Sequence, residues 1–463
     1  RPPRSTLFPY TTLFRSSDNW FVTWDTTGAY IPQMNIGRIP VKTEAEFQNY
    51  FNKHVNYVNN PFNEWNKNFL FFSGGTGTDQ NQLNQLREVN NFVINNYVTP
   101  APIGGNSTHF YKTINPTTNF GPYTAEKIQQ AIDAGAVFIS YLGHSGTQTW
   151  DNSITQPSQL KNKVNRNPLI TDFGCSTARF AEPDVTSFSQ LFVLSNEGQA
   201  IAYIGNSSLG FLSTSTMAPK LFYKKVLQDS VYNISEALKL AKIEMLQTYG
   251  SSGVYQLFAL TNTLIGDPII NLAIPPKPNL SLSSSKINLS IATPTDDLDS
   301  ITINLNYLNT GKVTADSFTV KVFDDYSDST KLIFESRRIL PKYLDSLAFT
   351  LGIKNKPGIH RLSINLDYLN EIDEITKGDN QLVYNLSVAS TSLRTTLIHE
   401  IENGSDDSIY FLNPVGKPSS DTLIVQVSNN SNFDFANAVQ IRFDTLFTKL
   451  NLPGLSFGNR YWI

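Results

Sequence analysis

The sequence predicts an α/β domain followed by an all-β domain, and two observations support this prediction. In residues 17–274, short apolar runs that stop at glycines alternate with amphipathic helical patterns, as in a mostly parallel sheet between helices. Beyond residues 275–278, which read Pro-Pro-Lys-Pro, the hydrophobic period changes to two. Because proline stiffens the chain and cannot continue a strand ladder, this stretch is interpreted as a linker.

The composition fits a folded chain that does not bind nucleic acid. With 463 residues, of which 40% are hydrophobic, the chain can form two or three domains with packed cores. The net charge of −3 provides neither a nucleic-acid footprint nor a basic membrane patch. The single cysteine excludes an internal disulfide, and no apolar run reaches transmembrane length.

The N-terminus looks foreign to the rest of the chain. Leu7–Ser16 resembles the translation of a common DNA-sequencing adapter, and Arg1–Ser16 is therefore set aside as an assembly artefact. On this interpretation the native protein begins further upstream, and any export signal is missing from this sequence.

The first elements of the α/β domain are a helix, a strand and two further helices. Thr43 and Glu46 can form a capping box, so a helix is expected to begin at Thr43. Its apolar stripe consists of Phe47, Phe51, Val55 and Val58. Residues 68–73 form the next buried strand, which ends at Gly74. Helices are expected to begin at Asp79 and to cover residues 123–134.

A histidine and the only cysteine follow two neighbouring buried strands. Residues 136–142 and 168–173 are short, rich in β-branched and aromatic residues, and stop at glycines. His144 comes directly after the first strand and Cys175 after the second. In open α/β sheets ligands bind at the carboxyl edge of the strands, where both residues are therefore expected. Imidazole can supply the base that a thiol needs to become a nucleophile, although a buried Cys and a loop His are an equally ordinary reading.

The remainder of the domain alternates again between helices and strands. The expected elements are a helix at 188–195, a strand at 200–204, a polar loop at 206–216, helices at 220–228 and 234–248, and a last strand at 269–272. Because the strand before it points toward the same edge, the polar loop is interpreted as a wall of a substrate pocket. The pocket residues predicted there are Leu209, Gly210 and Phe211.

Five stretches, in this order, resemble the gingipain-type cysteine peptidases. They are Gly-Arg-Ile-Pro-Val at 37–41, Gly-His-Ser-Gly at 143–146, the cysteine segment that ends at Phe180, Gly-Gln-Ala-Ile-Ala-Tyr-Ile-Gly at 198–205, and Leu-Ile-Gly-Asp-Pro at 264–268. The similarity covers Asp18 to Ala273. It implies a caspase-like fold, a catalytic dyad of Cys175 and His144, and protein or peptide substrates, with no cofactor and no catalytic metal.

The implied reaction is acyl transfer through a thioester on Cys175, with His144 managing the protons. The developing oxyanion needs preorganised N–H donors. The backbone N–H of Cys175 and that of Ser145 or Gly146 are the candidates, and Ser145 is preferred.

Two positions depart from the gingipain pattern. Where that pattern has an acidic residue that orients the histidine, this chain has Gly74, and Asp151, Asp79 and Asp18 are left as alternatives. The acidic residue that recognises a P1 arginine is expected near Asn84 or Gln85, neither of which is charged. Strict arginine specificity is therefore not expected.

The second part of the chain is predicted to be an immunoglobulin-like β-sandwich over residues 279–390. Segments 301–307, 318–322 and 360–366 alternate apolar and polar residues. Two stretches rich in Asp and Asn, at 306–311 and 367–374, resemble those of CARDB domains. Structural calcium is considered for the acidic cluster from Asp367 to Asp379, although carboxylates in a hairpin loop are more often solvated. Residues 391–463, which include the strand-like 422–427, are interpreted as the start of a further β-domain.

Three function classes follow. The first is a cysteine peptidase that is secreted or displayed on the surface of a Gram-negative bacterium. The second is a sortase-like transpeptidase of the type IX secretion machinery, which uses the same dyad and attaches cargo to a surface glycolipid. The third is a non-catalytic surface adhesion protein, which the presence of both Cys175 and His144 disfavours.

Overall fold

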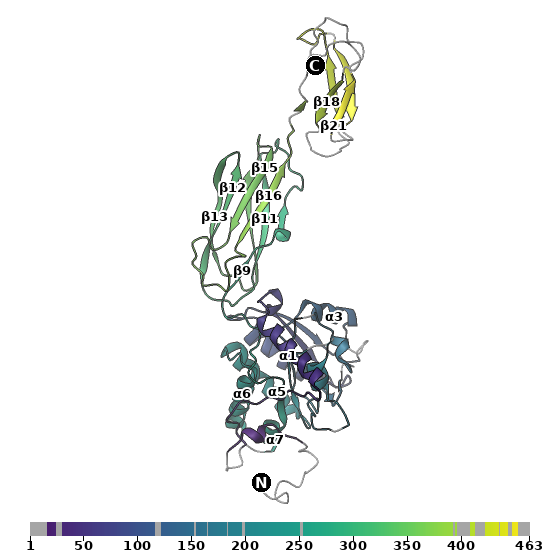
Figure 1. Cartoon of the computed structure of the whole chain (residues 1–463), viewed down its shortest axis with the longest axis vertical. Coiled ribbons are helices and arrows are strands. Elements are labelled where there is room, and N and C mark those ends of the chain that lie inside the picture. Colours follow the sequence, from purple (N-terminus) through teal and green to yellow (C-terminus); the bar gives the residue numbers. More distant parts are fainter. Residues whose placement is uncertain are drawn as a thin grey trace, which may run out of the picture.

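The computed structural model describes residues 16–24, 30–115, 122–151, 154–163, 165–182, 184–196, 200–250, 253–391, 394–395, 408–412, 422–434, 436–442 and 447–451. The predicted artefact at residues 1–15 therefore lies outside the described residues, with only Ser16 inside them. Figure 1 shows an α/β lobe followed by β-rich lobes. None of the described helices is long and apolar enough to cross a membrane.

The α/β domain is built on one mostly parallel sheet. The strands are β1 (Asn68–Ser73), β2 (Asn106–Tyr111), β3 (Phe138–Leu142), β6 (Leu169–Asp172), β7 (Ala202–Asn206) and β8 (Asn262–Ile265). Their order is β2-β1-β3-β6-β7-β8, and all neighbours are parallel except β7 and β8. A small hairpin, β4 (Ser145–Gly146) and β5 (Thr149–Trp150), follows β3 directly. The helices are α1 (Glu44–Asn59), α2 (Gln80–Val93), α3 (Ala125–Ala134), α4 (Phe188–Leu194), α5 (Leu212–Tyr223), α6 (Ile234–Tyr249) and α7 (Gly253–Thr261).

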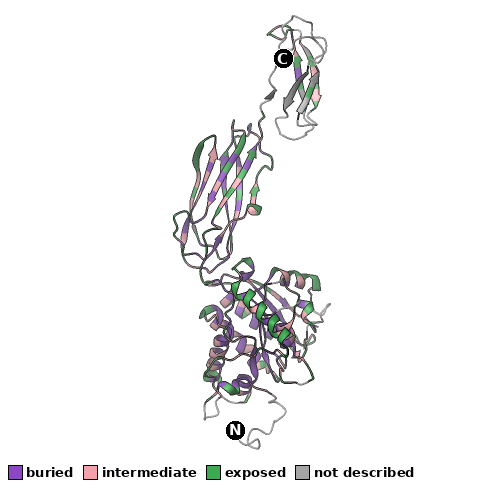
Figure 2. Cartoon of the chain, viewed as in Figure 1, coloured by how far each residue is buried: buried purple, intermediate pink, exposed green. Residues whose placement is uncertain are grey.

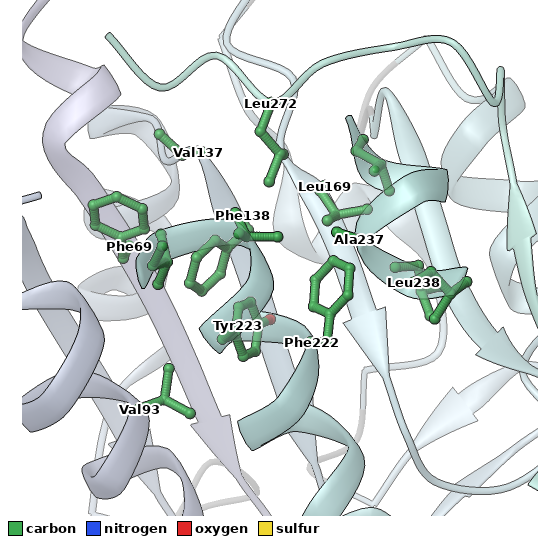
Figure 3. Close-up of a cluster of buried hydrophobic side chains, with 14 of the residues drawn as sticks. Phe69, Val93, Val137, Phe138, Leu169, Phe222, Tyr223, Ala237, Leu238 and Leu272 are labelled. Atoms are coloured by element: carbon green, nitrogen blue, oxygen red, sulfur yellow. The ribbon is translucent and has the colours of Figure 1, made fainter. Parts of the chain in front are cut away.

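Helices pack on both faces of the sheet because alternate strand residues are apolar on each side. Phe69 and Phe71 of β1 belong to one buried cluster, while Leu70 and Phe72 belong to the other. Figure 3 shows the first cluster, in which Phe69 and Phe138 from the strands meet side chains of α2, α5 and α6. A sheet held rigidly from both sides fixes the loops at its edges.

The apolar stripe of α1 does not face the core. The predicted capping box of Thr43 and Glu46 is present. However, the four apolar residues that the sequence groups together, Phe47, Phe51, Val55 and Val58, are all exposed, and Figure 2 shows much of this helix as exposed. The buried face consists instead of Tyr50, Lys53 and Tyr57, whose polar tips bond to backbone groups beneath the helix.

Other elements also differ from the sequence prediction, among them the helix predicted at 220–228, which is part of a longer helical segment that begins with α5 at Leu212. Residues 106–111, which carry no strong strand pattern, form the edge strand β2. The predicted last strand at 269–272 is wrong, since β8 closes the sheet and Asn271 forms only an isolated bridge with Asn233. The predicted loop at 206–216 is shorter, because β7 includes Asn206 and α5 begins at Leu212.

The second domain is the predicted sandwich. One sheet contains β9 (Leu280–Ser281), β10 (Ile287–Leu289), β11 (Ser300–Asn309) and β14 (Leu344–Gly352). The other contains β13 (Ser329–Ile339), β12 (Ser317–Tyr326), β15 (Gly358–Asn365) and β16 (Gln381–Val388). Both sheets contribute alternate residues to one buried core, as in immunoglobulin-like folds. The observed α/β domain and the sandwich confirm the predicted fold class.

The linker between the two domains is not a free spacer. Its carbonyls at Lys277 and Pro278 accept hydrogen bonds from the N–H groups of Lys312 and Ile375. Across the junction, the N–H of Val313 donates to the carbonyl of Pro102, and the ammonium of Lys67 donates to the carbonyl of Gly311 at 2.6 Å. The two domains are therefore joined by direct hydrogen bonds in addition to the chain itself.

Residues beyond the sandwich form short antiparallel pairs. They are β17 (Arg394–Thr395), β18 (Ser408–Leu412) and β21 (Phe447–Asn451) in one sheet, and β19 (Thr422–Val427) with β20 (Asn437–Arg442) in another. The strand predicted at 422–427 is confirmed.

Candidate active site

Four neighbouring parallel strands end at one edge of the sheet, and the loops after them hold the predicted site residues. Gly74 follows β1, His144 follows β3, Cys175 follows β6, and Gly210 lies in the loop after β7. The carboxyl ends of parallel strands share an edge, which is the usual place for a site in such a sheet. The fold therefore brings His144 and Cys175, 31 positions apart, to the same edge.

The Cys175 thiol is partly buried beneath the loop after β7. Its Sγ accepts a hydrogen bond from the backbone N–H of Gly210 at 3.3 Å. Burial raises the pKa of the Cys175 thiol, and the bond from Gly210 opposes that rise. The resting group is consequently a thiol, which needs a base during the reaction.

A buried carboxylate, Asp172, supports the cysteine loop. Its Oδ1 accepts from the N–H of Gly174 at 2.7 Å and from the hydroxyl of Ser145 at 3.2 Å. Its Oδ2 accepts from the indole N–H of Trp150 at 3.1 Å and from the hydroxyl of Tyr203 at 3.4 Å. Burial raises the pKa of Asp172 to about 7. Asp172 was not among the residues predicted for the site, although an acidic residue inside an apolar strand is itself an unusual signal.

One of the two predicted oxyanion donors, the N–H of Cys175, already has a hydrogen-bond acceptor. The backbone N–H of Cys175 donates to Ser145 Oγ at 2.7 Å. The Ser145 hydroxyl can in turn donate to Asp172 Oδ1 or to the carbonyl of Cys175 at 3.1 Å. A carbonyl oxygen that takes the Cys175 N–H must therefore displace the Ser145 hydroxyl.

The imidazole of His144 faces the loop after β1 and the start of α2. Its Nε2 lies 3.2 Å from Thr76 Oγ1 and 3.2 Å from Gln82 Oε1. No hydrogen bond joins the imidazole to Cys175 in the described part of the chain. Catalytic hydrogen bonds are often long before substrate binds, so this arrangement fits a resting site.

The three acidic alternatives near His144 have different surroundings. Asp79 Oδ1 caps α2 by accepting from the N–H groups of Asn81 and Gln82. Asp18 pairs with Arg38, and Arg38 forms an isolated β-bridge with Ile265 of β8. Only Asp151 touches the histidine, since its Oδ2 accepts from the backbone N–H of His144 at 3.4 Å.

The three consecutive residues predicted for the pocket have different surroundings in the structure. Gly210 contacts Cys175, whereas Leu209 is exposed and Phe211 immediately precedes α5. A groove of about 550 Å³ lies between α2 and α5. It is lined by Gln85, Glu88, Val89, Asn91, Phe92, Asn95, Asn96, Thr216 and Lys220. Both helices begin at the site, because Gln82 bonds to His144 and α5 follows the Gly210 loop.

No metal cluster of three or more His, Cys, Asp or Glu side chains occurs among the described residues. In the acidic loop of the sandwich, Asp367 accepts from the N–H groups of Glu371 and Ile372 and pairs with Lys377. The chain thus satisfies this carboxylate itself, and structural calcium stays a prediction.

The comparisons with known proteins identify the family of the chain. The model of peptidase family C25 matches residues 2–273. The chain belongs to peptidase family C25. The match begins inside the stretch that the sequence predicts to be an artefact. Membership supports a cysteine peptidase, and it confirms the resemblance that the five stretches suggested.

Solved structures were also compared. The Arg-specific cysteine proteinase gingipain R is 14% identical, with 80% of this chain and 79% of that chain covered and a TM-score of 0.46. The complex of the pro- and mature domains of RgpB from Porphyromonas gingivalis is 13% identical, with 80% of each chain covered and a TM-score of 0.46. A CARDB domain from Pyrococcus furiosus, solved with two metal ions, is 19% identical, with 24% of this chain and 94% of that chain covered and a TM-score of 0.21. No curated protein matched the chain.

Proposed function

We propose that this C25-family chain cleaves secreted or surface proteins by acyl transfer, with Cys175 as nucleophile and His144 as the general acid and base. One observation carries the proposal most directly. The loop after β6 holds the Cys175 sulfur against the N–H of Gly210, at the sheet edge that also holds His144. A sulfur that is held by a backbone donor, at a sheet edge that also carries an imidazole, has the groups that thiol activation requires.

The proposed reaction conserves atoms and charge at each step. His144 takes the proton of the Cys175 thiol, and the sulfur adds to the peptide carbonyl carbon. The C–N bond then breaks as the imidazolium protonates the leaving amine, which leaves a thioester on Cys175. Substrate entry displaces the Ser145 hydroxyl from the Cys175 N–H, so that this donor can stabilise the oxyanion.

The acceptor that resolves the thioester distinguishes hydrolysis from transpeptidation. Water releases an acid, whereas an amine on a surface glycolipid would give the sortase-like product of a type IX secretion system. Both acceptors attack the same thioester, so they are tested together. Action outside the cytoplasm, at the surface of a Gram-negative bacterium and alongside outer-membrane secretion machinery, belongs to the same proposal.

The test uses the whole chain with fluorescein-labelled casein and a peptidyl chloromethylketone. We expect the inhibitor to label Cys175, and Cys175→Ala and His144→Gln to lose activity by several orders of magnitude. His54→Gln is the matched control, because His54 lies on α1 and pairs with Asp267. Full activity in Cys175→Ala would exclude the peptidase mechanism. Mass spectrometry of products with and without glycine amide as acceptor then separates hydrolysis from aminolysis.

A further inference from the structure

We propose that Asp151 is the positioning residue for His144, and that it acts by fastening the two loops that surround the imidazole. This inference rests on the proposed role of His144. Asp151 lies in a different loop from Gly74, and its role follows from its contacts alone.

The first set of contacts holds the backbone of His144. Asp151 directly follows the β4–β5 hairpin, which starts at Ser145 and folds the chain back beside His144. The N–H of Asp151 donates to the carbonyl of His144 at 2.9 Å, and Asp151 Oδ2 accepts from the N–H of His144 at 3.4 Å. Both backbone polar groups of the histidine are therefore bonded to one residue.

The second set of contacts holds the loop that touches the imidazole. Asp151 Oδ2 also accepts from the backbone N–H of Gly75 at 2.7 Å. The next residue, Thr76, lies with its Oγ1 3.2 Å from His144 Nε2. A single carboxylate oxygen thus joins the backbone of His144 to the loop that supplies a partner for its ring.

The space for this carboxylate exists because two glycines face it. An ideal Cβ on Gly74 would lie 2.1 Å from Asp151 Oδ1, and one on Gly143 would lie 3.1 Å from the same atom. Any side chain at position 74 would collide with the carboxylate where it now stands. The absence of a side chain at position 74 and the presence of Asp151 are therefore two parts of one arrangement.

The carboxylate of Asp151 is also hydrogen-bonded by a residue of β3. The hydroxyl of Tyr141 donates to Asp151 Oδ1, and burial raises the pKa of Tyr141 well above its ordinary value, so this hydroxyl stays a donor. Tyr141 stacks on Trp150 with ring centroids 4.3 Å apart, and Trp150 is fully buried. Lys112 Nζ approaches the Asp151 carbonyl at 3.5 Å. A residue that is hydrogen-bonded to a buried tyrosine and to two loops can hold His144 in place.

The activity test compares Asp151→Asn with Asp133→Asn, a matched control on α3 near the opposite edge of the sheet. On the peptide that the whole enzyme cleaves best, we expect Asp151→Asn to lower kcat at least tenfold with less than a twofold change in KM. Asp151→Glu should recover part of the loss, and so should the pair Asp151→Gly with Gly74→Asp, which returns a carboxylate to the same space. A kcat within twofold of the wild type in Asp151→Asn would overturn the proposal.

A second measurement does not need activity and so separates this proposal from the proposed function. The imidazole Cε1–Hε1 resonance of His144, assigned by its loss in His144→Gln, should shift in Asp151→Asn and stay in place in Asp133→Asn. If the Asp151→Asn variant remains folded by circular dichroism, an unmoved resonance contradicts the positioning role. If the resonance moves but Cys175→Ala retains activity, the proposed function fails while the positioning contact stands.

Discussion

The backbone N–H of Cys175 donates to Ser145 Oγ at 2.7 Å. Ser145 belongs to the hairpin after His144, so the two loops of the proposed dyad are joined by this bond. The bond also occupies an N–H that the proposed reaction uses to stabilise the oxyanion. In the resting site this N–H is therefore already hydrogen-bonded, and a substrate carbonyl has to replace Ser145 Oγ as its acceptor.

Removing the Ser145 hydroxyl should open this donor. We expect Ser145→Ala to speed acylation by a peptidyl substrate about two- to tenfold, which is less than the 10²–10³ attributed to a whole oxyanion donor because only a competitor is removed. Alkylation of Cys175 by iodoacetamide is the control. That displacement develops no oxyanion, so its rate should not change. Slower acylation with unchanged alkylation would show that the hydroxyl assists the reaction.

We predict the P1 preference by placing the substrate along the groove between α2 and α5. An unpaired cationic P1 side chain would be costly to bury, and positions 84 and 85 are uncharged. Asp79 could approach only by giving up its cap on α2, a loss of about 0.5–2 kcal/mol. We therefore expect a peptide library to show small or neutral P1 residues ahead of arginine and lysine.

Glu88 is the carboxylate that could contradict this prediction, because it also lines the groove. Lys220 lines the groove as well, and its Nζ lies 4.7 Å from the centroid of the Phe92 ring. A library profile dominated by arginine or lysine would contradict the prediction. In that event Glu88→Gln should lose basic substrates selectively, and Asp79→Asn would be the comparison variant.

The junction between the domains should respond to pH through Lys67, at the end of the short helix Glu64–Lys67. Its Nζ donates to the carbonyls of Ile103 and Gly311, and burial lowers the pKa of Lys67 to about 7 from an ordinary value of 10.5. Between these two values the unfolded chain binds more protons, so the free energy of unfolding rises with pH. Below about pH 7 both states are charged and Lys67 contributes no slope.

The measurement is Tm at pH 7 and pH 9 for the wild type and for Lys67→Met. The buried Lys53 and Lys242, whose pKa values burial also lowers to about 7, contribute a slope of the same sign in both proteins. We expect a smaller rise of Tm in Lys67→Met than in the wild type. Equal rises would show that Lys67 does not titrate in this range.

The positions of His144 and Cys175 in the fold could be predicted from the sequence better than the packing could. His144 and Cys175 could be placed because each follows a strand whose apolar run ends at glycine, and parallel strands bring their ends together. Asp151 could not be assigned, since its contacts with His144 depend on the turn of a hairpin that carries no strong pattern. The hydrogen-bond partners of Asp172 could not be deduced either, because Trp150 and Tyr203 come from other segments.

Helix α1 shows why a correct helix can be given the wrong face. Its apolar residues repeat with helical period, and so do Tyr50, Lys53 and Tyr57, which have long apolar stems and polar tips. The second set was buried because backbone groups beneath the helix need partners. The N–H of Asp267 donates to the hydroxyl of Tyr50, and the N–H of Ala273 donates to that of Tyr57. Hydrophobic periodicity alone does not show which backbone groups need a hydrogen-bond partner.

Truncation of one residue from each face of α1 tests this inversion. Phe51 is 48% exposed and Tyr57 is 5% exposed, so the same change to alanine removes very different amounts of packing. We expect Phe51→Ala to lower the free energy of unfolding by less than about 1 kcal/mol, and Tyr57→Ala to lower it by about 3–5 kcal/mol. Tyr57→Phe isolates the hydroxyl, and it should cost about 1–3 kcal/mol because it leaves the partly buried N–H of Ala273 without its acceptor. Urea unfolding of the three variants gives the comparison. Equal losses in Phe51→Ala and Tyr57→Ala would mean that both faces of α1 are packed in solution, by a partner or by part of the chain outside the described residues.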